Sequence, residues 1–188
     1  MSRRAAAFVL GLALALVAGG VLWWWLQGRG PGGLRGEGPD GATGTVEKVA
    51  FDLYLPADGG MLRPQRVELQ VTGAPKDRIR KIVESLLAGG AGSLRLFPEG
   101  VMLAGVQLSE AGIAYVNLNW DGHADPPPSG STEEMQRVYG IVDSITANVP
   151  EAKRVVLLWN GTQRNTFSGH LDTSGPLAPN TSLVVRSR

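Results

Sequence analysis

Alternating apolar and polar positions predict two strands early in the folded part of the chain. Residues 49–55 (VAFDLYL) and 66–72 (RVELQVT) each place an apolar side chain at every second position. Side chains at this spacing lie on one face of an extended chain, as in a half-buried strand. The stretch between the two runs is PADGGMLRPQ, with two glycines and two prolines. We therefore predict a hairpin with a loose, wide connection.

Two later segments change to the period of an amphipathic helix. Pro75 suits a first helical turn, and Gly89 and Gly90 suit the end of that helix. Ser131 and Glu134 fit a capping box, in which the glutamate accepts a hydrogen bond from a free backbone N–H at the helix start. We predict two helices, each with one buried face. The apolar positions are Ile79, Ile82, Val83, Leu86 and Leu87 in the first helix, and Met135, Val138, Val142, Ile145 and Val149 in the second.

The remaining pattern predicts a second hairpin and a buried strand. Residues 101–120 contain two strands that turn at Gly112, and the alternation breaks near Gly105, as it does at a β-bulge. Residues 154–160 (RVVLLWN) form a short apolar run typical of a central strand, which the pair Asn160-Gly161 would turn. This order of elements predicts an α/β (α+β) two-layer sandwich. Its mixed sheet would have about five strands, with both helices on one face.

The N-terminal segment predicts a membrane anchor. Residues 5–26 carry no charged side chain, and a helix of that length can cross a hydrocarbon core of about 30 Å. The tryptophans at 23–25 end this run, where aromatic side chains gather at a membrane interface. We expect a retained transmembrane signal-anchor rather than a cleaved signal peptide, whose apolar region is shorter. Residues 1–4 would be a cytoplasmic tail, residues 27–45 a Gly/Pro-rich linker, and residues 46–188 one extracytoplasmic domain.

Charge and cysteine usage exclude several classes of function. The formal net charge of the 188 residues is +1, so the chain has no basic field that would attract nucleic acid. Cysteine is absent, which excludes disulfides, thiol nucleophiles and thiolate metal sites. We therefore expect no nucleic-acid partner.

Two His-x-Asp pairs are the candidates for a metal or catalytic site. They are His123 with Asp125, which Asp121 precedes at the same spacing, and His170 with Asp172. Zinc enzymes usually gather closely spaced histidines, as in His-Glu-x-x-His, and this chain has no such motif. It also lacks a Gly-x-Ser-x-Gly elbow and a phosphate-binding loop. We interpret these residues as loop residues, and we expect no catalytic residue, no metal ligand and no cofactor.

The clustered carboxylates keep a second function open. Glu133 and Glu134 are explained by the start of a helix, where negative charge is favourable. Asp121, Asp125 and Glu133 are nevertheless the one group that could act in glycoside cleavage, which needs two carboxylates about 5–9.5 Å apart. The alternative function is therefore an envelope domain that binds or hydrolyses peptidoglycan or another carbohydrate. A small-ligand binder is a third possibility, and it would need a deep pocket.

The folded part resembles the GerMN domain family, named for a protein of sporulation and spore germination. The resemblance covers about residues 48–178 and rests on FDLYLP, IVESLLAGG, LFPEGVML, AYVNLNWD, the long segment GSTEEMQRVYGIVDSITANVPEAKRVVLLWNG, and SGHLDTSGPL. It implies a membrane-tethered extracytoplasmic domain without an established catalytic centre, and a fold like that of ring-building domains. It also implies that the GHLDTSGPL tail is a structural closing segment. The chain has one copy of the domain and no lipobox cysteine, in contrast to tandem lipoprotein members.

These expectations combine into one functional hypothesis. We expect a non-enzymatic domain, anchored in the cell membrane by a single span, that mediates protein–protein assembly in the bacterial cell envelope. Sporulation or germination is a process in which it would act. Its partners would be envelope proteins or further copies of itself, with peptidoglycan as the partner under the alternative. Open sheet edges and exposed helix faces are the expected contact surfaces.

Overall fold

The computed structural model describes residues 45–89 and 95–185. Contacts divide the chain into two units, Met1–Gly41 and Ala42–Arg188, and all described residues belong to the second. The expected tail at 1–4, the span at 5–26 and nearly all of the linker at 27–45 lie outside the described residues. Within the described residues, neither helix combines the length and the apolar character needed to cross a bilayer.

The chain begins with a long two-stranded ribbon. Strands β1 (Glu47–Pro56) and β2 (Leu62–Val71) pair antiparallel along their whole length, and a short 3-10 turn, Asp58–Gly60, joins them. The predicted hairpin is therefore confirmed, but its predicted wide connection is wrong. Leu62 is fully buried and extends the second strand toward the turn, which sequence alternation alone did not reveal.

Two helices follow the ribbon and alternate with the strands of a second sheet. Helix α2 (Pro75–Leu87) precedes strands β3 (Val101–Leu108) and β4 (Ile113–Trp120), and helix α3 (Ser131–Asn148) precedes β5 (Arg154–Trp159) and β6 (Thr162–Gln163). This sheet has the order β3-β4-β5-β6. Only β4 and β5 run parallel, because α3 carries the chain from one end of the sheet back to the other.

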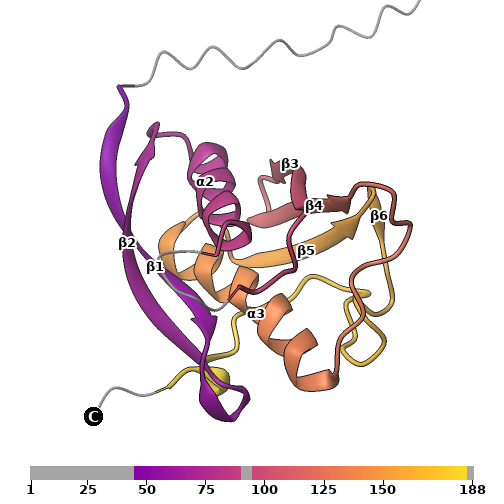
Figure 1. The fold of residues 1–188 in the computed structure, drawn as a ribbon. Helices are drawn as coiled ribbons and strands as arrows, with labels where there is room; N and C mark the ends of the chain where they lie inside the picture. The colour runs from indigo at the N-terminus through magenta and orange to yellow at the C-terminus, as the bar shows by residue number, and fades with distance from the viewer. Residues whose placement is uncertain (1–44, 90–94, 186–188) are drawn as a thin grey trace, which may run out of the picture. The chain divides into compact units, whose positions relative to one another are not determined.

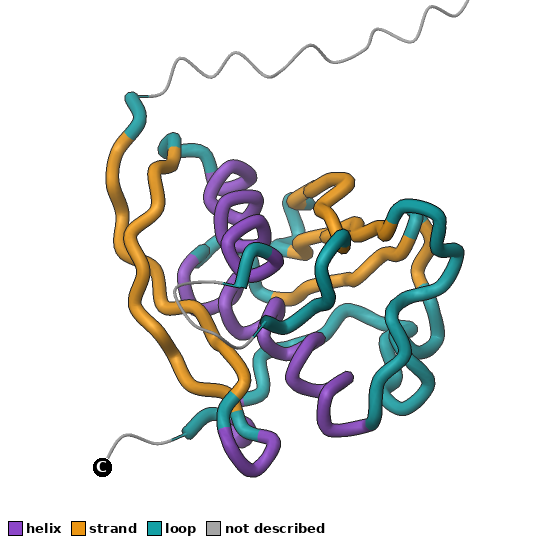
Figure 2. Tube along the Cα trace, in the orientation of Figure 1, coloured by secondary structure: helices purple, strands orange, loops and turns teal. Residues whose placement is uncertain are grey.

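The two helices lie between the ribbon and the four-stranded sheet (Figures 1 and 2). Helix α3 contacts both β1 and β5, and α2 contacts β3 on one side and the ribbon on the other. The mixed α+β class is confirmed. The prediction of a single sheet in a two-layer sandwich is wrong, because the strands form two separate sheets on either side of the helices. Alternation shows that a strand has one buried face, but it does not show which strand lies beside it.

One hydrophobic core joins all three layers. It contains the inward faces of both sheets and both predicted apolar helix stripes, apart from Met135 and Leu87, which are half-buried. The largest fully buried side chains include Trp159, Phe51 and Phe97. The side chain of Phe167, from the last part of the chain, packs edge-on against Phe97 and Trp159. The C-terminal tail therefore contributes to the core.

Several local predictions are confirmed. Pro75 occupies the first turn of α2, and the helix ends before Gly89, whose φ is +98°. The β3–β4 pairing shifts register between Leu103 and Gly105, which is the predicted bulge. Asn160 and Gly161 both have positive φ and turn β5 into β6, as a type I′ hairpin requires.

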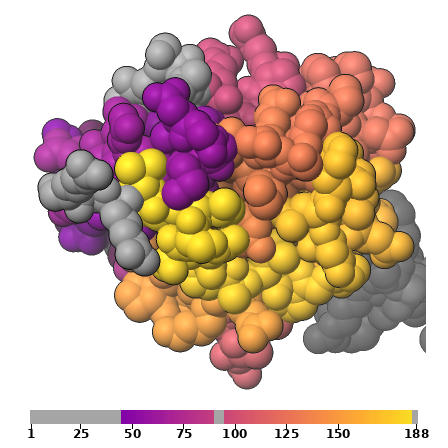
Figure 3. Space-filling view, turned by 90° about the horizontal axis from the view of Figure 1, so that it is seen from below, coloured from indigo at the N-terminus to yellow at the C-terminus, as the bar shows by residue number. Residues whose placement is uncertain are grey.

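After β6 the chain forms a long tail that returns across the molecule to the ribbon. Leu177 exchanges two backbone hydrogen bonds with Val155 at the start of β5. Farther on, the Val185 N–H donates to the Leu62 carbonyl, so the tail ends beside β2. Figure 3 shows this yellow segment lying between the indigo ribbon and the orange surface that includes α3.

Candidate functional site

The candidate residues that follow β4 make separate local contacts. The imidazole of His123 stacks on the Trp120 indole, with ring centroids 3.7 Å apart and planes 15° from parallel. The Asp125 carboxylate pairs with the Arg164 guanidinium at 2.6 Å, whereas Asp121 is exposed. Although Asp121, His123 and Asp125 alternate in the sequence, their side chains make separate contacts and do not form one site.

Glu134 has a different role from the one that the capping box predicts. The residue before the helix is Gly130, and no side chain caps the N-terminus of α3. The Glu134 carboxylate is fully buried and points toward the C-terminal tail. There it accepts hydrogen bonds from the backbone N–H groups of Ser168 at 2.6 Å and His170 at 2.8 Å, and its Oε2 lies 2.9 Å from Nδ1 of the His170 ring. The capping-box prediction is wrong because the Glu134 carboxylate bonds to backbone N–H groups of the tail and not to the start of its own helix.

The environment of Glu134 keeps its carboxylate charged. Burial acts to raise its pKa, but hydrogen bonds from the backbone of Ser168, His170 and Leu171, and from the His170 ring, outweigh burial and lower the pKa overall. Gly169 has φ of +109°, which lets the tail turn tightly enough to direct successive N–H groups at one carboxylate. Glu134 is thus the anchor for the tail.

Arg137, one turn farther along α3, holds two other segments. Its guanidinium is nearly buried and donates to the carbonyls of Leu96 at 3.0 Å and Pro127 at 3.0 Å. It also pairs with the Glu133 carboxylate at 2.6 Å. Glu133 is therefore occupied in positioning a buried arginine, and the three prolines at 126–128 run beside the helix start. The sequence pattern does not distinguish Arg137, because a charged residue within an amphipathic helix usually faces solvent.

The two His-x-Asp pairs do not meet. Asp172 accepts hydrogen bonds from the N–H and hydroxyl of Ser174, an ordinary local turn, and these bonds lower its pKa. In the described part of the chain, no three His, Asp or Glu side chains lie close enough together to bind a metal ion. Asp125 and Glu133 each form an ion pair with a different arginine, Arg164 and Arg137, so these two carboxylates of the glycosidase alternative make separate local contacts.

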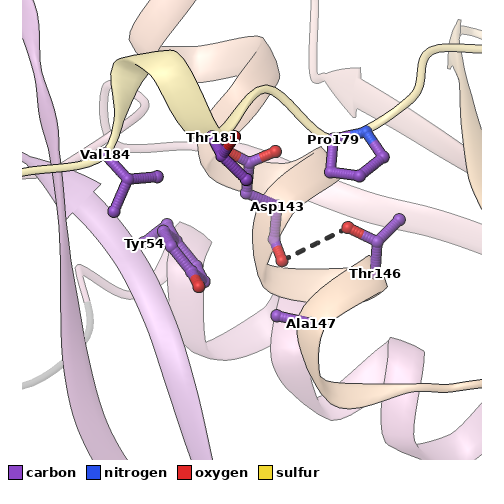
Figure 4. A pocket seen from close by; sticks show the side chains of 7 residues that line it. All are labelled: Tyr54, Asp143, Thr146, Ala147, Pro179, Thr181 and Val184. Atoms are coloured by element: carbon purple, nitrogen blue, oxygen red, sulfur yellow. Dashed lines mark hydrogen bonds between the residues drawn. The ribbon is translucent and has the colours of Figure 1, made fainter.

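A pocket beside α3 contains another buried acid. The cavity of about 210 Å³ is lined by residues of β1, α3 and the tail: Tyr54, Asp143, Thr146, Ala147, Pro179, Thr181 and Val184 (Figure 4). One Asp143 oxygen accepts the Asn180 N–H at 2.8 Å, and the other oxygen is buried without a partner among the described residues. Burial raises the pKa of Asp143, and the bond from Asn180 offsets this only in part.

The pKa of Tyr54 in the same pocket is also raised, first by burial and then by the negative charges of Asp143 and Asp52. The cavity is smaller than the range of about 300–1,000 Å³ typical of ligand pockets. A second, open hollow of about 330 Å³ lies beside Arg80 and Tyr115. Neither cavity is the deep apolar pocket that the small-ligand alternative requires.

Side chains of α3 replace a neighbouring strand along β1. The Asn148 amide exchanges hydrogen bonds with both the N–H and the carbonyl of Asp52, at 2.9 and 2.8 Å. The Ser144 hydroxyl accepts the Tyr54 N–H at 2.8 Å. The edge of β1 that faces away from β2 is therefore occupied by the helix at Asp52 and Tyr54.

The opposite edge of the ribbon, on β2, is open. In an antiparallel pair, the residue opposite one whose backbone points outward also points outward. Asp52 and Tyr54 face Arg66 and Pro64, so the outward positions of β2 are the even-numbered residues from Leu62 to Gln70. At Arg66, Glu68 and Gln70, these backbone groups bond to no described residue. We call positions 64, 66, 68 and 70 the open edge.

Comparisons with known proteins show which family and which solved structures this domain is similar to. The model of the Germane family, described as sporulation and spore germination, matches residues 52–165. No curated protein matches the chain.

Among solved structures, the first GerMN domain of the sporulation protein GerM from Bacillus subtilis is 18% identical with a TM-score of 0.52, covering 70% of this chain and 96% of that one. The tandem GerMN domains of GerM give 18% and 0.55, covering 70% and 46%. A candidate lipoprotein from Clostridium perfringens gives 20% and 0.50, covering 71% and 87%. At these identities the likeness concerns the fold.

Proposed function

This chain belongs to the Germane family of sporulation and spore germination domains, and from that premise we propose that it mediates protein–protein assembly in the bacterial cell envelope. The domain acts without catalysis, outside the cytoplasmic membrane, anchored by the apolar segment at residues 5–26. The process that it serves is sporulation, germination or a related step in building the envelope. The C. perfringens structure of the same fold, described as a lipoprotein, is consistent with a tethered domain.

The open edge of β2 is the observation that carries this proposal. A strand with unbonded N–H and C=O groups can accept a strand from another protein, which gives affinity through backbone hydrogen bonds. Leu62, at the beginning of the same edge, already accepts such a bond from Val185. On β1 the outward groups of Asp52 and Tyr54 already bond to α3, so the longer free edge of this ribbon is on β2.

The side chains that could have suggested catalysis have structural roles, which also supports a binding function. Glu134 holds the tail, and Arg137 with Glu133 holds the segments around Leu96 and Pro127.

Site-specific crosslinking tests the proposal in the full-length chain in its membrane. A photoreactive residue in place of Arg66 or Gln70 lies beside the open edge, and one in place of Glu110 lies on an exposed turn of the other sheet. We expect discrete protein adducts from positions 66 and 70 and none from 110. Equal adducts from all three positions, or adducts from 110 alone, would refute the edge as the contact surface.

A further inference from the structure

We propose that the strand accepted by the open edge is β2 of a second copy of this chain, paired antiparallel about Val67. The inference rests on the proposed assembly function and names its partner. It follows from the positions of the outward backbone groups, the charges beside them, and the length of edge that remains uncovered.

Backbone geometry limits the registers that two copies can adopt. Outward groups must meet outward groups, so an even-numbered residue of one β2 must face an even-numbered residue of the other. Three registers keep most of the open edge paired, with symmetry centres at Arg66, Val67 or Glu68. Any larger shift of the register leaves more residues of the open edge without a partner in the other strand.

Charge selects one of the three registers. A centre at Arg66 places this arginine opposite the same arginine of the second copy, and a centre at Glu68 places two carboxylates together, which is unfavourable in a cross-strand pair. A centre at Val67 instead places each Arg66 opposite Glu68 of the second copy. Both side chains are well exposed, at 70% and 60%. Their present partners, Asp52 and Lys48, lie on the same outer face of the ribbon and complete an alternating charge pattern.

The part of β2 whose edge is uncovered is also centred on Val67. Val185 occupies the outward carbonyl of Leu62, and the strand ends at Val71. Residues 63–71 are what remains, and Val67 is their midpoint. In this register each Arg66–Glu68 pair exchanges two backbone hydrogen bonds, whereas each Pro64–Gln70 pair exchanges one, because Pro64 has no N–H to donate.

The inner face of the ribbon gains contacts in the same arrangement. Val67 and Leu69 are half-buried beside the core. Pairing about Val67 places the two Val67 side chains together and sets Leu69 beside Gln65 of the second copy. Apolar surface at the rim of the core is thereby covered. The contact is isologous, because the same residues contribute from both copies, so it closes as a dimer.

Single cysteines test this register directly, because the natural chain contains none. In the proposed pair the two Cα atoms of residue 67 are about 4.5 Å apart, within the range that a disulfide bridges. Val67→Cys in the full chain should therefore form a disulfide-linked dimer under mild oxidation. Gln65→Cys is the matched control: its two copies are separated by four positions, about 13 Å. Gln65→Cys mixed with Leu69→Cys should form the mixed dimer.

Charge exchange provides a second test that does not depend on cysteine placement. We expect Arg66→Glu or Glu68→Arg, each added to Val67→Cys, to slow dimer formation by at least about threefold, since like charges then face each other. Mixing these two variants restores opposite charges across the pair and should restore the rate. Equal crosslinking at 65 and 67, or no rescue in the mixture, overturns the proposed pairing. If adducts still form at 66 and 70 but Val67→Cys gives no dimer, the edge binds a different protein and only the self-pairing is refuted.

Discussion

Glu134 shows at the scale of one residue how a helix can organise a distant segment. Its carboxylate is fully buried yet bonded to successive groups of the tail, so the free energy of burying the charge is offset locally. A capping box would have stabilised only the first turn of α3. The observed contact instead joins residues 34 and 36 positions apart, and it fixes the tail that carries Phe167 into the core.

Glu134→Gln should destabilise the domain by about 3 kcal/mol at pH 7, because charge-assisted hydrogen bonds are lost and an amide N–H₂ then faces backbone donors. The native pKa lies below the unfolded value, so the carboxylate stabilises the fold above its unfolded pKa, and this stability is lost as the pH falls through the native pKa. The difference between wild type and variant should therefore shrink in acid. Urea unfolding at pH 7 and near pH 3 measures it.

Glu84→Gln is the control for this experiment. Glu84 forms an exposed ion pair with Lys81, so its substitution should cost less than about 1 kcal/mol. Equal destabilisation by both substitutions, or a Glu134→Gln difference that does not change with pH, would contradict the role assigned to Glu134.

At the scale of an element, α3 is shaped by having neighbours on two sides. Gly140 lies where the helix passes β1 most closely: a Cβ atom there would lie 2.7 and 2.8 Å from the two Leu96 methyl carbons and 3.0 Å from the Tyr54 carbonyl oxygen. Asn148 and Ser144 then bond the strand. The helix therefore serves as the second neighbour of β1.

Gly140→Ala should lower the free energy of unfolding by about 1–2 kcal/mol, although Ala is normally favoured over Gly within a helix by about 1 kcal/mol. The overpacking against Leu96 and Tyr54 outweighs helix propensity. Gly130→Ala, at the start of the same helix, adds a Cβ in open space and should change stability by less than about 1 kcal/mol. Thermal unfolding compares the two variants, and a more stable Gly140→Ala protein would contradict the close approach.

The same element shows what the sequence can and cannot predict. Periodicity gave both helices, the two hairpins and the bulge at Gly105, because these depend on neighbours within about ten residues. It gave neither the separation into two sheets nor the partners of Glu134 and Asp143, which lie more than thirty residues away. It also missed the contact of Arg137 with Leu96, 41 residues away. A signal was present in α3: Arg137, Asp143 and Ser144 interrupt a helix that is buried on more than one side. Polar residues at such positions require partners from other elements.

At the scale of the whole molecule, the two edges of the ribbon differ. Helix α3 bonds the outward groups of Asp52 and Tyr54 on β1, the tail bonds only the beginning of β2, and the core fixes the ribbon to the rest of the domain. The membrane-tethered domain proposed above would present this edge to other proteins at the membrane surface. We propose that this edge of β2 binds other proteins through its backbone groups.

A proline at position 68 tests that claim most directly. The Glu68 N–H points away from β1, so Glu68→Pro removes an outward donor without removing a bond of the ribbon, just as the natural Pro64 does. Glu68→Ala removes the same side chain but keeps the N–H. The measurement is the yield of crosslinked complexes formed by each full-length variant in its membrane. We predict that Glu68→Ala retains most of the complex and that Glu68→Pro loses it at unchanged folding. Equal yields from the two variants would contradict backbone pairing at β2.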